Sequence, residues 1–181
     1  MANRLVILSD MWGSKKGLWI TSYLGYLQQY YDITFYDCQH LADVSLAVNS
    51  PENIHKEFSE GGLETAVAHL LKKEKETSHY LAFGIGGTIA WKAALKGLPM
   101  KSLYAISSTR LRLEIQKPQA NVQLLYGQKD EFRPTAEWSD RIGVVLEIVN
   151  NFGHELYSDE KIISKVCQDL LAKVMQKQFV A

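Results

Sequence analysis

The fold class of this 181-residue chain is decided by the stretch His79-Tyr80-Leu81-Ala82-Phe83-Gly84-Ile85-Gly86-Gly87-Thr88. Five residues typical of a buried strand lead directly into a Gly-Ile-Gly-Gly turn. An Ala-rich run, Thr88–Leu95, continues as a helix and is expected to stop at Gly97-Leu98-Pro99. A strand, a tight turn and a helix in direct succession indicate an α/β protein.

The rest of the chain repeats this alternation of short apolar runs with amphipathic ones. The candidate strands are Leu5–Ser9, Ile33–Tyr36, His79–Phe83, Ser102–Ser107, Val122–Tyr126 and Val144–Val149. Further helices are expected at Leu18–Tyr30, at Leu63–Leu71 and from Glu160 to about Lys177. Several strands are continuously apolar, as parallel strands covered on both faces are. The pattern predicts one domain over residues 1–181, three-layered, with a mostly parallel sheet of about six strands and helices on both faces.

Composition narrows the class of partner. Lys and Arg together equal Asp and Glu, so the formal net charge is zero and no overall field favours nucleic acid or an acidic membrane. The apolar run Leu5–Leu8 is far too short for a secretory signal or a membrane helix. Cys38 and Cys167 are expected to be free, reduced thiols in a cytoplasmic protein.

The glycine-rich turn has the context of the G-x-S-x-G nucleophile elbow, in which a serine sits between strand and helix. In that register Ala82 takes the first small position, Gly84 the serine position and Gly86 the last glycine. Glycine has no side chain with which to attack a carbonyl carbon. It does adopt strained turn geometry at little cost, so the turn should persist without its nucleophile.

Two later strands carry residues in the order that a hydrolase needs. Val122–Tyr126 is followed by a G-x-x-D segment that holds Asp130, and Val144–Val149 is followed by Phe152-Gly153-His154. With the elbow before them, these segments make the chain resemble the α/β-hydrolase superfamily, and the resemblance covers nearly all of it. The order of elbow, acid and histidine is that of the family.

The resemblance implies a role for each matching residue. Asp130 corresponds to the acid that orients the histidine, His154 to the general base, and Gly84 to a vestigial nucleophile position. The oxyanion-type backbone N–H groups would be those of Ile85 and of Trp12, in the loop Ser9–Gly13. Asp10 stands in that loop where the family usually has a histidine, and its carboxylate would oppose a developing oxyanion. Asp130 could also be a plain turn residue, and His154 a plain loop histidine.

Other side chains at the carboxyl ends of strands are candidates for a ligand pocket. They are Asp10, Cys38, Ser107 and Ser108. Cys38 or either serine could act as a substitute nucleophile, although a small packed thiol and loop-capping hydroxyls are the plainer interpretations.

No cofactor or metal is expected. The run from Gly84 begins like G-x-G-x-x-G but ends in Ile89, and the five histidines lack ligand spacing. The leading hypothesis is an inactive or atypical hydrolase-fold protein that binds or responds to a small ester- or acyl-like molecule. The alternative is an atypical hydrolase of small carboxylic esters or thioesters, in which His154 and Asp130 use water or a substitute nucleophile. A third possibility is an interaction subunit without a ligand. The pattern leaves the oligomeric state open.

Overall fold

The computed structural model describes residues 3–180, with only the backbone course given for residues 177–180. Its centre is one six-stranded sheet in the order β2-β1-β3-β4-β5-β6, and every neighbouring pair of strands is parallel. The strands are β1 (Asn3–Leu8), β2 (Tyr31–Tyr36), β3 (Ser78–Phe83), β4 (Met100–Ile106), β5 (Asn121–Gly127) and β6 (Val145–Val149). All six predicted strands are present, with ends that differ by up to two residues, and the expected fold class is confirmed.

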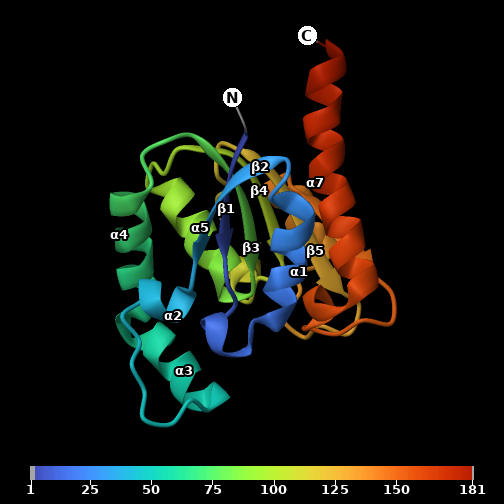
Figure 1. The fold of residues 1–181 in the computed structure, drawn as a ribbon. Helices are drawn as coiled ribbons and strands as arrows, with labels where there is room; N and C mark the ends of the chain where they lie inside the picture. The colour runs from blue at the N-terminus through green and yellow to red at the C-terminus, as the bar shows by residue number, and fades with distance from the viewer. Residues whose placement is uncertain (1–2, 181) are drawn as a thin grey trace.

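Helices cover both faces of the sheet (Figure 1). On one face α1 (Leu18–Leu27) packs beside α7 (Glu160–Val180), and on the other α4 (Leu63–Lys73) packs beside α5 (Ile85–Leu95). Each face has its own apolar core, because the strands present buried side chains in both directions. The predicted helix over Leu18–Tyr30 ends earlier, at Leu27, since the chain must turn there to enter β2.

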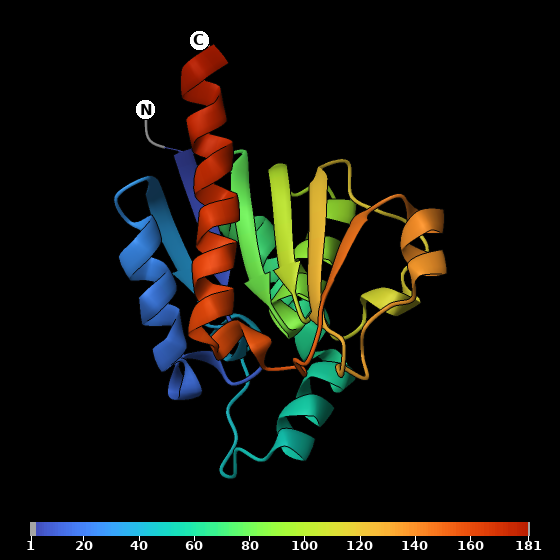
Figure 2. The same cartoon turned by 90° about the vertical axis from the view of Figure 1, so that its right-hand side faces the viewer.

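Several short elements were not predicted from the sequence. They are α2 (Cys38–Leu41), α3 (Pro51–Glu57), α6 (Ala136–Ile142), the π-helical turn η2 (Phe58–Gly62), and the 3₁₀ turns η1 (Gly13–Lys16), η3 (Leu111–Leu113) and η4 (Leu156–Ser158). Most are too short to show helical periodicity in the sequence. Figure 2 shows that α3 extends beyond the edge at which the strands end.

The order of the strands places two loops side by side. The chain passes from β1 to β2 on one side, then returns to place β3 on the other side of β1. The loops that follow β1 and β3 therefore leave in opposite directions and open a crevice between them, which is where ligands bind in open α/β sheets. Asp10 follows β1 and Gly84 follows β3, so both lie at this switch point.

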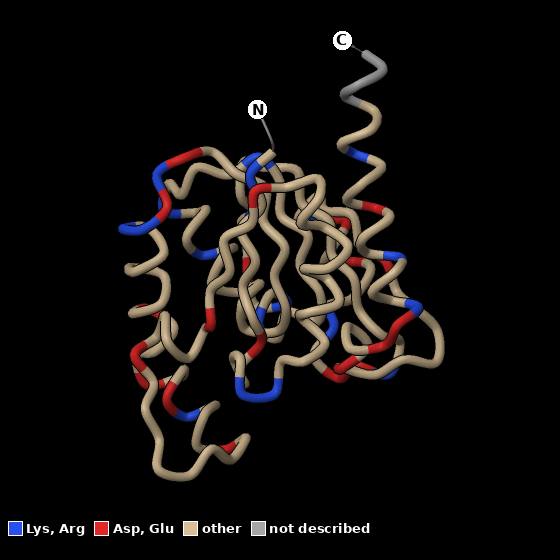
Figure 3. Tube along the Cα trace, viewed as in Figure 1, with Lys and Arg blue, Asp and Glu red and all other residues tan. Residues whose placement is uncertain are grey.

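Charged residues of both signs are distributed along the chain trace (Figure 3). None of the helices among residues 3–180 is sufficiently long and apolar to cross a membrane.

Candidate functional site at the carboxyl edge

The turn after β3 has the backbone of a nucleophile elbow. Gly84 has φ 51° and ψ −124°, a combination that residues with a side chain rarely adopt, and α5 begins at the next residue. The sequence suggested a helix that starts at Thr88, but Gly86 and Gly87 already lie inside it. A Cβ atom on Gly86 would lie 2.4 Å from the Ser9 carbonyl oxygen, so this glycine lets α5 approach the end of β1.

Asp130 and His154 are brought together as the sequence predicted. Asp130 Oδ2 lies 2.9 Å from His154 Nδ1, across 24 residues of chain. Asp130 is 3% exposed, and its other carboxylate oxygen accepts the Phe132 backbone N–H at 2.9 Å. A carboxylate facing Nδ1 favours the tautomer that carries its proton there, which leaves Nε2 free to accept a proton. The pair thus has the geometry of an acid and a general base.

Asp10 lies directly beside the elbow and is almost fully buried, with 4% of the residue exposed. Its Oδ2 accepts the Tyr157 hydroxyl at 2.9 Å, and its Oδ1 accepts the Trp12 backbone N–H at 3.0 Å. Burial raises the pKa of Asp10 to about 6, against the pull of these two hydrogen bonds. Burial, with the nearby Asp10 charge added, also raises the pKa of the Tyr157 hydroxyl.

The two expected oxyanion donors are in different states. The Ile85 N–H is the first of α5, so it has no acceptor within the helix. The Trp12 N–H is already bound to the Asp10 carboxylate. Of the two N–H donors that the family resemblance implies, the Trp12 N–H is bound to Asp10 and the Ile85 N–H is not.

A small cavity of about 70 Å³ lies over the elbow. It is lined by residues from five segments of the chain that meet at the carboxyl edge: Asp10, Met11, Trp12, His55, Phe58, Gly84, Ile85, Thr109, His154, Glu155 and Tyr157. Trp12, Gly84, Ile85, Asp10 and His154 were all named from the sequence. Asp130 stands behind His154 rather than in the wall.

Three of the predicted pocket residues are placed elsewhere. The Cys38 thiol is buried and donates to the Ser9 carbonyl at 3.1 Å, and burial raises its pKa. The Ser107 hydroxyl donates to the backbone carbonyl of His154 at 2.6 Å. Ser108 is buried, and its hydroxyl would overlap a Cβ placed on Gly87, so it faces α5. None of these three side chains lines the cavity over Gly84.

Sequence reasoning missed other residues of the wall, above all His55, Phe58 and Tyr157. His55 belongs to α3 and Phe58 to η2. The position of this segment depends on how it folds back over the edge at which the strands end. Tyr157 lies shortly after His154 in the sequence. This closeness to the predicted base was the one signal that could have placed Tyr157 in the cavity wall.

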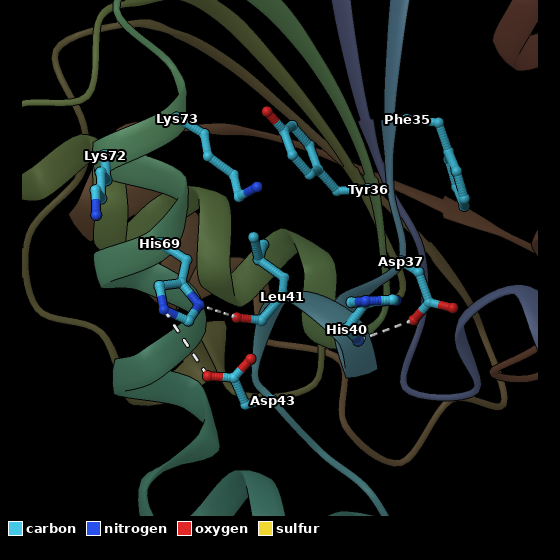
Figure 4. A pocket seen from close by; sticks show the side chains of 9 residues that line it. All are labelled: Phe35, Tyr36, Asp37, His40, Leu41, Asp43, His69, Lys72 and Lys73. Atoms are coloured by element: carbon cyan, nitrogen blue, oxygen red, sulfur yellow. Dashed lines mark hydrogen bonds and ion pairs between the residues drawn. The ribbon is translucent and has the colours of Figure 1, made fainter.

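A separate cavity of about 720 Å³ lies at the edge of the sheet, between the end of β2 and α4 (Figure 4). His69 stands in its wall, with Nδ1 2.8 Å from the Leu41 carbonyl oxygen and Nε2 3.9 Å from Asp43 Oδ2. It contains none of the residues around Gly84. Among the residues described, no group of three or more His, Cys, Asp or Glu side chains could hold a metal ion.

The comparisons with known proteins agree with this architecture. No family model matches the sequence, and no curated protein matches it. Among solved structures, a Klebsiella pneumoniae subsp. pneumoniae protein, provisionally assigned as a dienelactone hydrolase, has a TM-score of 0.71 at 16% identity, over 97% of this chain and 87% of its own. A provisionally assigned hydrolase of the alpha/beta superfamily from Xanthomonas campestris pv. campestris has a TM-score of 0.66 at 16% identity. The match covers 94% of this chain and 99% of that protein. A predicted CIB-like hydrolase from Thermoplasma acidophilum has a TM-score of 0.64 at 20% identity. The match covers 92% of this chain and 86% of that protein.

Proposed function

We propose that this chain, which has the α/β-hydrolase fold, is a small-molecule-binding or regulatory protein that does not hydrolyse esters through an acyl-enzyme. The observation that carries the proposal is Gly84, whose backbone has the elbow conformation and whose side chain is absent. A hydrolase of this type without its nucleophile keeps only the residual rate that binding and the oxyanion site provide.

Asp10 supports the same conclusion independently. In a working hydrolase, backbone N–H groups stabilise the negative charge that develops on the carbonyl oxygen. Here the Asp10 carboxylate accepts the Trp12 N–H. One of the two donors is therefore bound to a group that has the same negative charge as an oxyanion. At pH values above its pKa of about 6, Asp10 would repel an oxyanion at this place. The cavity is thus better suited to binding an ester- or acyl-like molecule than to reacting with it.

One observation favours a second candidate, the atypical hydrolysis of small esters or thioesters. The contact between His154 and Asp130, at 2.9 Å, is that of an intact base and its orienting acid. Such a base could take a proton from water as the water oxygen attacks the ester carbonyl. The protonated His154 would then give that proton to the alkoxide or thiolate as its bond to the carbonyl carbon breaks, which releases the acid and the alcohol or thiol. Substitute nucleophiles receive less support, because the Cys38 thiol and the Ser107 hydroxyl are committed to backbone carbonyls outside the cavity.

The test compares wild type, His154→Ala and Gly84→Ser against a fluorophosphonate probe and a panel of activated esters and thioesters. We expect that the probe does not label wild type. We also expect that wild type and His154→Ala turn over the esters and thioesters equally slowly. Gly84→Ser serves as the matched positive control, because it restores a hydroxyl at the elbow. Turnover by wild type that disappears in His154→Ala would overturn the binding role and establish the second candidate.

A further inference from the structure

A larger groove lies next to the small cavity over Gly84. Its volume is about 690 Å³, and its walls come from α3, η2 and the segments that follow β1, β4, β5 and β6. The two hollows share Met11, His55, Thr109 and His154 in their walls, so the groove lies directly beside the cavity over Gly84. Figure 2 shows α3 lying beyond the strand ends. Its residues Pro51, Glu52 and His55 line one side of the groove.

Two guanidinium groups line the groove without a carboxylate partner. Neither Arg110 nor Arg112 forms an ion pair with any residue that the structure describes. Arg110 Nη2 donates to the Ser59 hydroxyl at 2.6 Å, and Arg112 Nη1 donates to the Thr109 carbonyl at 2.5 Å. These neutral acceptors orient the two groups and leave their charge uncompensated. Each guanidinium has five N–H donors, so most remain available.

The other titratable groups in the wall do not cancel this charge. Glu52 is the carboxylate that lines the groove, against two arginines, and His55 and His154 are the remaining ionisable side chains. The side chains that line the groove therefore carry an excess of positive charge, although the whole chain has a net charge of zero and the buried Asp130 carboxylate lies behind His154.

Apolar side chains complete the walls beside the arginines. They are Met11, Pro51, Leu113 and Phe132. Leu113 is 69% exposed and Phe132 is 39% exposed, so both present apolar surface to a ligand. The Arg112 guanidinium stands 5.5 Å from the centre of the Phe132 ring, so cationic and apolar surface meet at one point.

We infer that this arginine groove (Arg110, Arg112, Leu113, Phe132 and Met11) binds an organic anion with an apolar body, the anionic head on the guanidinium groups and the body directed towards Gly84. The inference rests on the proposed function and gives it a ligand class. Guanidinium N–H groups match the paired oxygens of a carboxylate or a phosphate monoester. A cation would be repelled by the two guanidinium groups, and a neutral chain would gain no ion pair from them.

Isothermal titration of the full chain at low salt tests the inference with four eight-carbon probes: octanoate, octyl phosphate, octanamide and octylammonium. We expect both anions to bind at least about tenfold more tightly than octanamide, the loss typical of one charge-assisted hydrogen bond. The tighter anion identifies the head group. Octylammonium should bind most weakly, and added salt should weaken the anions alone.

Arg112→Gln and Arg110→Gln should each reduce anion affinity about tenfold while leaving octanamide binding unchanged. Arg141→Gln, on α6 and away from the groove, is the matched control and should behave like wild type. Arg112 is exposed, so its variant remains informative even if Arg110→Gln folds poorly.

The inference is overturned if octanamide binds as tightly as octanoate, if neither anion binds, or if the arginine variants bind the anions as wild type does. Equal binding of octanamide would leave the proposed binding role standing. Conversely, His154-dependent ester turnover would refute the proposed function and leave the preference for anions intact.

Discussion

Replacing Asp10 with asparagine should stabilise this protein, and the gain should depend on pH. The Asp10 carboxylate is buried beside the elbow, and burial raises its pKa from 3.8 to about 6. The folded state therefore binds the proton more strongly than the unfolded state does. The stability associated with protonated Asp10 is fully present below about pH 4 and is lost as the pH rises through 6.

The magnitude follows from the shift in pKa. A difference of about 2 units, at about 1.4 kcal/mol for each, corresponds to about 3 kcal/mol of lost stability above pH 7. Asparagine has the same shape without the charge. Its carbonyl can still accept the Trp12 N–H, while the Tyr157 hydroxyl must turn to accept from the amide. We therefore expect a net gain of between about 1 and 3 kcal/mol at pH 7.5 and almost none at pH 4.

Denaturant unfolding of wild type and Asp10→Asn, followed by circular dichroism at several pH values from 4 to 8, measures this difference. Asp37→Asn is the control of opposite sign. Burial alone would raise the pKa of Asp37, but hydrogen bonds from Ser14, His40 and Gln39 outweigh it and hold the pKa below its usual value. Its carboxylate therefore contributes stability that is present above the unfolded pKa, so Asp37→Asn should destabilise the protein at neutral pH.

A pH-independent difference between wild type and Asp10→Asn, or a loss of stability at pH 7.5, would refute the reasoning, provided that Asp37→Asn behaves as described. Either result would mean that Asp10 is not a strained buried charge. The electrostatic argument against oxyanion stabilisation at this site would then fail as well.

Three further predictions concern the same edge of the sheet. Gly84→Ser should lower the free energy of unfolding by about 1–3 kcal/mol, because φ is positive there and the new Cβ would lie 3.3 Å from that of Asp10. The variant should also hydrolyse activated esters weakly, and its rate should increase when Asp10→Gly is added. A Gly84→Ser protein that is inactive and as stable as wild type would contradict the elbow assignment. Gly86→Ala should be strongly destabilising in thermal melts because its Cβ would meet backbone, whereas Gly25→Ala, with nothing within 4 Å, should stabilise α1 by up to about 1 kcal/mol. Cys38 should react with a thiol reagent no faster than the protein unfolds, because its sulfur is fully buried.

Local sequence was sufficient for the strands and for the elbow. The run His79–Phe83 and the glycines after it form a strand, a turn and a helix because each residue's preference acts on its immediate neighbours. The pairing of Asp130 with His154 was expected from the resemblance to the α/β-hydrolase superfamily. In the structure it arises because β5 and β6 are adjacent parallel strands whose following loops emerge at one edge. The conformation at Gly84 follows from the same local signal.

Only the tertiary structure decided what surrounds Gly84. The contact between Asp10 and Tyr157 joins residues 147 positions apart, and it exists because β1 lies at the switch point opposite the last loops of the chain. His55 reaches the cavity because α3 folds back over the strand ends, and Cys38 turns away from it because its thiol bonds to the end of β1. Periodicity encodes which residues are buried. It does not encode which buried side chains, brought by loops from distant parts of the chain, share one cavity, because that depends on the order in which the strands assemble.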